Sequence, residues 1–418
     1  MQLRLYHLTW FAVFTATLDY RFFTDTPGIP SVSFLHIEGI VLLFALVVLS
    51  GTKPAFARKN GVLMREGRWV LMYFLWACVA SLWGILHSNY QSAAQYEDLL
   101  PSLFLFVAVI LSVKSKADLQ GLITAYKIGM VIELFFGASQ ALFGAPRPVP
   151  LNEGAQWKTD LTGAFVTNPE FLPTGLFTHP NGYALFCIPF VLLIVAEVRY
   201  QPHRNVGQLL MNIGLLLVLV LVLSKDYTKG AYAWIALGMI MIFLPAGLFR
   251  FRHILGWLIL LGGIIGLTVL GLQEVDTMQS RYGLWQAAFA TLENPMVLAF
   301  GNGNNAMLQQ SLRFSNMYYP SSHNTFLDQA IVFGLPALLL YGAILIKSIR
   351  VAASLPGMLP VGERGTAIFL HAGIVALLGG FFFEPGMGGT MLQAQFFLLA
   401  AFTVVLHRGR HSHKGKLT

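Results

Sequence analysis

His323 is the residue of this sequence best suited to acid–base chemistry, because it stands where a long loop is expected to meet the start of an apolar helix. A histidine has an ordinary pKa of about 6.5 and accepts protons near neutral pH. Asn324 follows it directly, and Asp328 orients the imidazole only if His323 lies in the loop and the loop folds back. The alternative is that His323 caps the helix or is an ordinary polar residue at its end.

Arg281 lies at the edge of a predicted amphipathic helix. Apolar side chains recur there at helical spacing and form one face: Met278, Tyr282, Trp285, Phe289 and Leu292. Such a helix is suited to lying in a membrane interface. An arginine beside that face binds phosphate through a planar, bidentate fork and does not deprotonate, and the neighbouring Tyr282 is a supporting candidate. The alternative for Arg281 is a headgroup anchor of the common snorkelling kind.

A third candidate is the short turn 224–230, in which Lys225 and Lys229 flank Asp226. The turn leads into a helix whose free N–H groups and dipole favour an anion. Two lysines at a helix N-terminus predict a second contact to phosphate or diphosphate. The alternative is a solvated turn with a Lys–Asp pair.

Weaker candidates surround these three. Arg147 is a further cation for a diphosphate, and His179 with Asn181 forms either a helix start with Pro180 at its first position or a substrate-facing polar cluster. Charged residues inside predicted spans are functional candidates because burying charge in a membrane is costly: Glu38, Lys127, Glu133 and Asp328. The predicted outer loops contain no set of residues with metal-ligand spacing, so we expect a reaction without a metal or other cofactor.

The composition identifies the elements that must position these residues. Of 418 residues, 56% are apolar and 11% charged, and the mean hydropathy is +0.65, whereas soluble domains carry roughly 25% charged residues. A membrane span needs about 20 apolar residues. Twelve segments of this character predict a single, all-α, polytopic membrane domain over residues 1–418: 6–22, 33–50, 69–88, 98–113, 119–143, 180–198, 208–224, 231–249, 254–272, 325–346, 366–383 and 391–406.

The net charge of +8 is distributed in a way that argues against nucleic-acid binding. Most Lys and Arg residues gather in short loops that alternating spans place on one side with both termini, which is the pattern of the cytoplasmic side of a bacterial inner membrane. The first apolar segment lacks the features of a cleavable signal peptide. Cys78 and Cys187 fall in apolar segments and supply no disulfide or metal framework. The opposite, periplasmic side then receives two long loops, 144–179 and 273–324, and loops of this length are usually functional or disordered.

The stretch from Arg281 to Leu327 resembles the O-antigen ligases and O-antigen polymerases, which are bacterial membrane glycosyltransferases. In that family a large periplasmic loop runs from an arginine near Leu-Trp, through a glycine-rich turn, to a histidine followed by Phe-Leu and a Gly-Leu-Pro helix. The counterparts here are Arg281-Tyr282-Gly283-Leu284-Trp285, Gly301-Asn302-Gly303-Asn304, His323-Asn324-Thr325-Phe326-Leu327 and Gly334-Leu335-Pro336. The segments Gly175-Leu176-Phe177 and His179-Pro180-Asn181 are similar to the start of a family span, and the twelve-helix, GT-C-like topology also matches.

The resemblance implies an inverting, metal-independent transfer from an undecaprenyl-diphosphate-linked glycan on the periplasmic face. The acceptor is lipid A-core in a ligase, or another lipid-linked repeat in an O-antigen or exopolysaccharide polymerase, and the sequence leaves this choice open. One position departs from the family, which usually has Ser-Arg-Gly where this chain has Thr228-Lys229-Gly230. Lysine keeps the charge but loses the bidentate fork.

The rival interpretation is a transporter or a flippase for lipid-linked sugars, in which the charged residues inside the spans would bind substrate or protons. Transporters often show two related halves. We find no similarity between the halves of this chain, and its polar motifs lie in loops.

Overall fold

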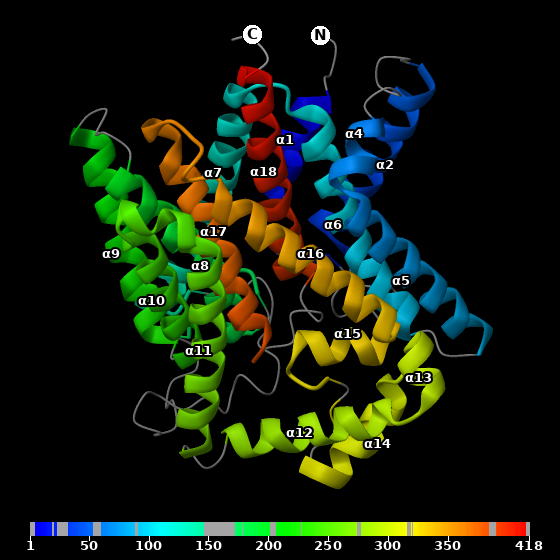
Figure 1. Cartoon of the computed structure of the whole chain (residues 1–418). Helices are drawn as coiled ribbons and strands as arrows, with labels where there is room; N and C mark the ends of the chain where they lie inside the picture. Colours follow the sequence, from blue (N-terminus) through cyan, green and yellow to red (C-terminus); the bar gives the residue numbers. More distant parts are fainter. Residues whose placement is uncertain are drawn as a thin grey trace.

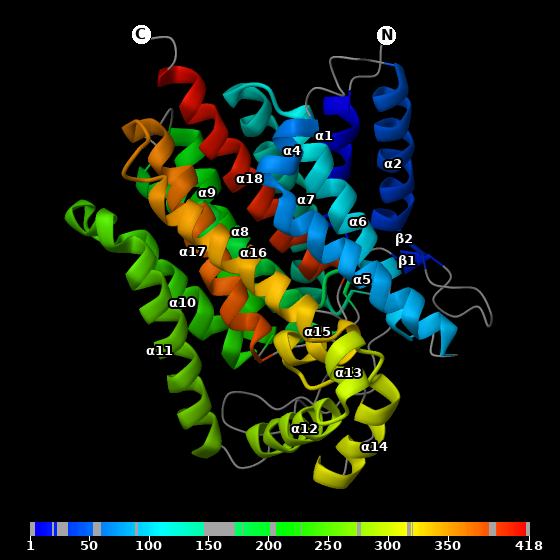
Figure 2. The same cartoon turned by 45° about the vertical axis from the view of Figure 1, so that its right-hand side comes forward.

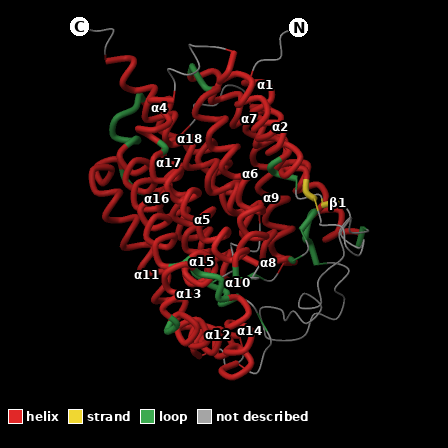
Figure 3. Tube along the Cα trace, turned by 90° about the vertical axis from the view of Figure 1, so that its right-hand side faces the viewer, coloured by secondary structure: helices red, strands yellow, loops and turns green. Residues whose placement is uncertain are grey.

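The structure is a computed structural model and describes residues 5–18, 21–22, 32–52, 60–87, 91–145, 172–177, 179–200, 206–226, 228–273, 277–315, 319, 321–383 and 390–414. These residues form seventeen α-helices, one 3-10 helix and a single pair of two-residue strands. The strands, β1 (Arg21–Phe22) and β2 (Val32–Ser33), pair antiparallel. The tube in Figure 3 is accordingly helical almost throughout its described part.

The helices follow in this order: α1 Leu5–Thr15, α2 Phe34–Thr52, α4 Asn60–Glu66, α5 Arg68–Leu86, α6 Gln91–Ser112, α7 Lys116–Phe143, α8 Pro180–Tyr200, α9 Val206–Asp226, α10 Lys229–Phe243, the 3-10 helix η3 Ala246–Phe251, α11 Arg252–Gln273, α12 Thr277–Leu292, α13 Pro295–Phe300, α14 Asn304–Ser315, α15 Thr325–Phe333, α16 Leu335–Ser354, α17 Val361–Phe381 and α18 Thr390–Lys414.

Eight of the described helices are long and apolar enough to cross a membrane, namely α5, α6, α7, α8, α9, α16, α17 and α18. Shorter apolar stretches lie in α2, α10 and α11. The chain is therefore an all-helical, multi-pass membrane protein. Each of the twelve ranges predicted from the sequence overlaps a helix, and seven of them each correspond to one of these eight long helices. The range 6–22 extends beyond α1, which ends at Thr15, as far as β1.

The prediction of one span over residues 325–346 is wrong. Gly334, at a φ of 84°, separates α15 from α16, so the span begins at Leu335 and Asp328 lies in a separate helix outside the eight long spans. Gly301 makes this corner compact, because a Cβ there would lie 2.2 Å from the carbonyl oxygen of Val332. The segment between predicted spans 9 and 10 therefore does not end at residue 324 but also includes α15.

The most deeply packed spans are α17 and α18, with 89% and 83% of their apolar windows buried, against 22% for α9 at the periphery. Figures 1 and 2 show both termini at one end of the bundle, whereas α12, α13 and α14 lie across the opposite end. We call these the terminal end and the crossing-helix end. The residues singled out in the long second loop all belong to the crossing-helix end.

Candidate functional site

The helix α12 packs against its neighbours through one leucine and two alanines. Leu284, Ala287 and Ala288 are buried and form a small core with Met307 of α14 and Ile331 of α15. The bulkier ring residues that the sequence places on one apolar face lie elsewhere, since Tyr282 is 54% exposed and Phe289 is 60% exposed. The predicted apolar ridge is therefore divided: Tyr282 and Phe289 are exposed, whereas Trp285 and Leu292 pack against the rest of the protein.

Arg281 is half-buried on α12, one turn before Trp285. Trp285 packs edge-on against Phe382 at the end of α17, with ring centroids 5.7 Å apart. Phe382 also contacts Phe326 in the first turn of α15, at 6.2 Å. Phe382 thus joins the helix that carries Arg281 to the helix start beside His323.

The loop before α15 holds His323 in a conformation that few residues adopt. Its φ is 53°, and a non-glycine residue in this region costs on the order of 1–3 kcal/mol. The His323 N–H donates to the Ser321 hydroxyl at 3.1 Å, and the ring stacks on Tyr319 with centroids 4.8 Å apart. The helix is capped by Asn324, whose side chain accepts the N–H groups of Phe326 and Leu327. The residue that caps the helix is therefore Asn324 and not His323. His323 is half-buried in the loop directly before it.

Asp328 fastens this loop to α15. Its carboxylate accepts the hydroxyls of Ser321 and Ser322 and the backbone N–H of Ser322, each at 2.7 Å. The loop therefore folds back over the helix, which is the condition under which Asp328 was expected to help orient His323. Burial raises the pKa of the Asp328 carboxyl, and the hydrogen bonds from the two serines and the nearby His323 oppose that increase. Ser321 and Ser322 are not among the site residues predicted from the sequence, although they directly precede His323. Their bonds to Asp328 form only because the loop folds back over α15, which sequence spacing alone does not predict.

The predicted turn 224–230 and the predicted helix start at 179–181 belong to one cluster. The Thr228 hydroxyl donates to the Asn181 side-chain oxygen at 2.9 Å and also pairs with the buried Asp226 carboxylate. His179 caps α8, because its Nδ1 accepts the N–H of Asn181 at 3.1 Å, as the helix-start interpretation predicts. Lys225 and Lys229 are exposed at the end of α9 and the start of α10.

This cluster lies at the same end of the bundle as Arg281. Near the end of α17, a Cβ on Gly379 would lie 2.1 Å from Trp234 of α10, and one on Gly380 would lie 2.7 Å from Leu185 of α8. The starts of α8 and α10 therefore pack beside the residues that precede Phe382. The three predicted groups of candidates are thus arranged around the end of α17.

Glu133 has a structural role that its isolated position in the sequence does not reveal. Its carboxylate accepts the N–H of Leu176 at 2.8 Å, and Gln140, two turns further along α7, accepts the N–H of Gly175 at 2.9 Å. Gly175 has a φ of 55°, and a Cβ there would lie 2.1 Å from the Glu133 carboxylate. These contacts fix the described part of the first loop, residues 172–177, inside the bundle.

Arg147 lies outside the described residues, together with most of the loop 144–179. Glu38 is buried in α2 beside Thr15, and Lys127 pairs with Glu197. Within the described ranges, no group of three or more His, Cys, Asp and Glu side chains is arranged to hold a metal ion.

No protein-family model matches the chain, and no curated protein matches it significantly. The family resemblance therefore stays a prediction from the motifs.

Proposed function

We propose that the protein is a membrane glycosyltransferase that transfers a glycan from an undecaprenyl-diphosphate carrier. The observation that carries the proposal is the His323 loop, in which a Ser–Asp network holds a strained backbone at the start of α15, and α15 packs against the helix bearing Arg281. Backbone strain of this kind persists only where the surroundings impose it, and it concentrates at functional sites.

The reaction requires a proton acceptor and a cation for the leaving group. His323 accepts the proton of the attacking sugar hydroxyl, and the hydroxyl oxygen bonds to the anomeric carbon as the bond from that carbon to the diphosphate oxygen breaks. The diphosphate leaves with the bonding electron pair, and attack from the opposite face inverts the configuration. Arg281 stabilises the developing negative charge, with Lys229 and Lys225 of the neighbouring turn and Arg147 as further cations.

The proposed orientation follows from the basic residues. The terminal end faces the cytoplasm of a bacterial inner membrane, according to the distribution of Lys and Arg. The crossing-helix end then faces the periplasm, where α12 lies at the depth of the lipid diphosphates. The exposed Tyr282 and Phe289 suit contact with the lipid interface.

Two acceptors fit the same chemistry, and a reconstitution experiment separates them. The purified protein is incubated with undecaprenyl-diphosphate-linked oligosaccharide and either lipid A-core or a second lipid-linked repeat. Transfer to core indicates a ligase, and a lengthened lipid-linked glycan indicates a polymerase. A folded protein that forms neither product contradicts the proposal, and movement of the intact lipid across a liposome would support a flippase instead.

A further inference from the structure

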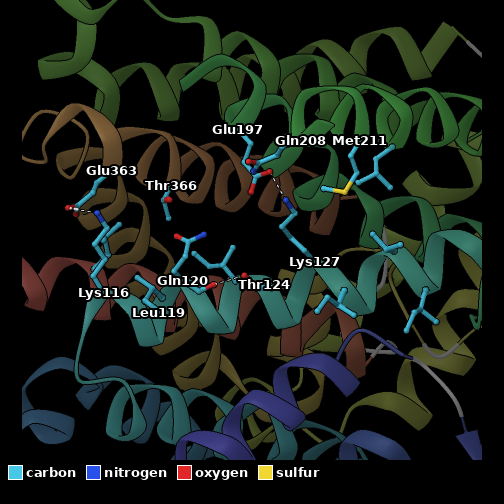
Figure 4. Close-up of a pocket in the computed structure, with 16 residues that line it drawn as sticks. Lys116, Leu119, Gln120, Thr124, Lys127, Glu197, Gln208, Met211, Glu363 and Thr366 are labelled. Atoms are coloured by element: carbon cyan, nitrogen blue, oxygen red, sulfur yellow. Dashed lines mark hydrogen bonds and ion pairs between the residues drawn. The ribbon is translucent and has the colours of Figure 1, made fainter. Parts of the chain in front are cut away.

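A cavity of about 710 Å³ lies between α7 and the helices α8, α9, α17 and α18, near the terminal end of the bundle (Figure 4). It is formed by the first half of α7, the start of α9, the end of α8 and the start of α17. Several apolar side chains on its edge are exposed, including Ile128 at 42% and Met211 at 53%. Since these lie on membrane-spanning helices, the cavity opens toward lipid.

The face of α7 that lines the cavity changes in polarity along its length. It begins with Lys116, Gln120 and Thr124 and ends with Ile128, Val131 and Ile132, and Lys127 lies between the two parts. Ile132 follows Lys116 by 16 residues, which is about 24 Å along an α-helix. A polar end and an apolar end separated by this length match an amphipathic lipid lying along the helix.

The polar end of the cavity carries both signs of charge. The Lys116 ammonium pairs with the Glu363 carboxylate at 2.9 Å, and the Lys116 side chain is 65% exposed. Figure 4 shows this pair at one end of the cavity and a second pair, Lys127 with Glu197, further along α7. The second pair is 2.6 Å apart, with exposures of 16% and 6%.

We propose that this cavity binds a zwitterionic phospholipid with a primary ammonium head, that is, a phosphatidylethanolamine. Its phosphate binds Lys116, its ammonium binds Glu363, and one acyl chain lies along Ile128 and Ile132. A head with both signs can insert into the Lys116–Glu363 pair without leaving either charge uncompensated, which a net-anionic head cannot do. Lys127 has three N–H donors and offers one to an ester carbonyl of the lipid while it remains paired with Glu197. The site lies near the end of the bundle opposite His323 and does not rest on the proposed reaction.

The selectivity is tested by native mass spectrometry of the full-length protein with an equimolar mixture of phosphatidylethanolamine, phosphatidylcholine and phosphatidylglycerol. The wild type is expected to retain phosphatidylethanolamine several-fold over both others, because the choline head donates no N–H to Glu363. Glu363→Gln removes the carboxylate and leaves Lys116, so the preference is expected to shift toward the anionic phosphatidylglycerol. Equal retention of the three lipids by the wild type, or an unchanged preference in Glu363→Gln, would overturn the assignment.

The location is tested by filling the cavity. Thr124→Trp places an indole on its wall and is expected to remove the retained lipid. The matched control, Leu217→Trp, adds the same side chain at a 66% exposed position of α9 that does not line the cavity, and it is expected to retain the lipid. Equal retention by the two variants, with unchanged helical content by circular dichroism, would place the lipid elsewhere.

Discussion

The crossing-helix end and the terminal end hold their polar side chains in different ways. At the crossing-helix end, Asp328 binds two serines within seven residues of itself, and the intervening His323 has a positive φ. At the terminal end, long side chains such as Lys116 and Lys127 reach across a cavity to carboxylates on other helices.

This difference indicates different uses. Short side chains bonded to a local backbone restrict orientation, which proton transfer requires because a base acts only within hydrogen-bond reach of its proton. Ion pairs of long side chains across an open space restrict orientation less and leave room for a ligand. We therefore expect substitutions at the crossing-helix end to change turnover and substitutions at the cavity to change lipid retention.

The largest effect is expected for His323→Ala. Loss of the general base should lower the rate of glycan transfer by roughly 10²–10⁴-fold, with lipid retention at the cavity unchanged. The measurement is product formation by the reconstituted protein. His87→Ala, which removes a ring in tilted contact with Trp83 at the end of α5, is the matched control and should retain wild-type turnover. A rate within a few-fold of wild type for His323→Ala would refute its role as base.

Arg281→Lys tests whether the bidentate fork is needed. Lysine keeps the charge but offers no planar pair of donors, so we expect transfer to fall roughly 10–100-fold, since loss of a single transition-state donor costs on that order or more. Arg313→Lys changes an exposed arginine on the neighbouring α14 and should have no effect. Near-normal turnover in Arg281→Lys would leave only a headgroup-anchor role for this residue.

Phe382→Ala tests whether the contact between α12 and α15 through α17 matters. It removes ring contacts to Trp285 and Phe326, each worth about 0.5–1.5 kcal/mol, and leaves Arg281 and His323 in place. If these contacts align Arg281 with His323, their loss should lower the rate of glycan transfer roughly tenfold, since about 1.4 kcal/mol corresponds to a factor of ten. Phe289→Ala, on the exposed face of α12, is the control; an equal decrease in both variants would mean that Phe382 has no specific positioning role.

The smallest effect is expected for Asp328→Asn, measured as the change of thermal stability with pH. Because burial raises the pKa of this carboxyl in the folded state, the folded protein binds the proton more tightly than the unfolded chain does. The tighter proton binding adds to the free energy of unfolding. This contribution is fully present below the ordinary pKa of an aspartate and is lost as pH rises through the raised folded-state pKa. The melting temperature of the wild type minus that of Asp328→Asn should fall as pH rises from acid to neutral. A difference that grows over this range would mean that the hydrogen bonds from Ser321 and Ser322 outweigh burial.

Much of the fold could be predicted from the sequence because hydropathy acts locally. Every predicted span overlaps a helix, and the helix containing Arg281 begins and ends close to its predicted positions. The same local pattern failed at residues 325–346, where an unbroken apolar run hides the corner at Gly334. For α12 the periodicity predicts an apolar face but does not identify the buried contacts of Leu284, Ala287 and Ala288 with α14 and α15.

The sequence by itself determined that this chain spans the membrane many times and which residue types at 281, 323 and 225–229 suit phosphate and proton chemistry. Only the tertiary structure decided that Thr228 bonds Asn181, that Phe382 joins Trp285 to Phe326, and that α7, α9 and α17 line one cavity. The physical reason is that burial and helix formation follow from neighbouring residues, whereas these contacts join segments far apart in the chain and depend on how the helices pack.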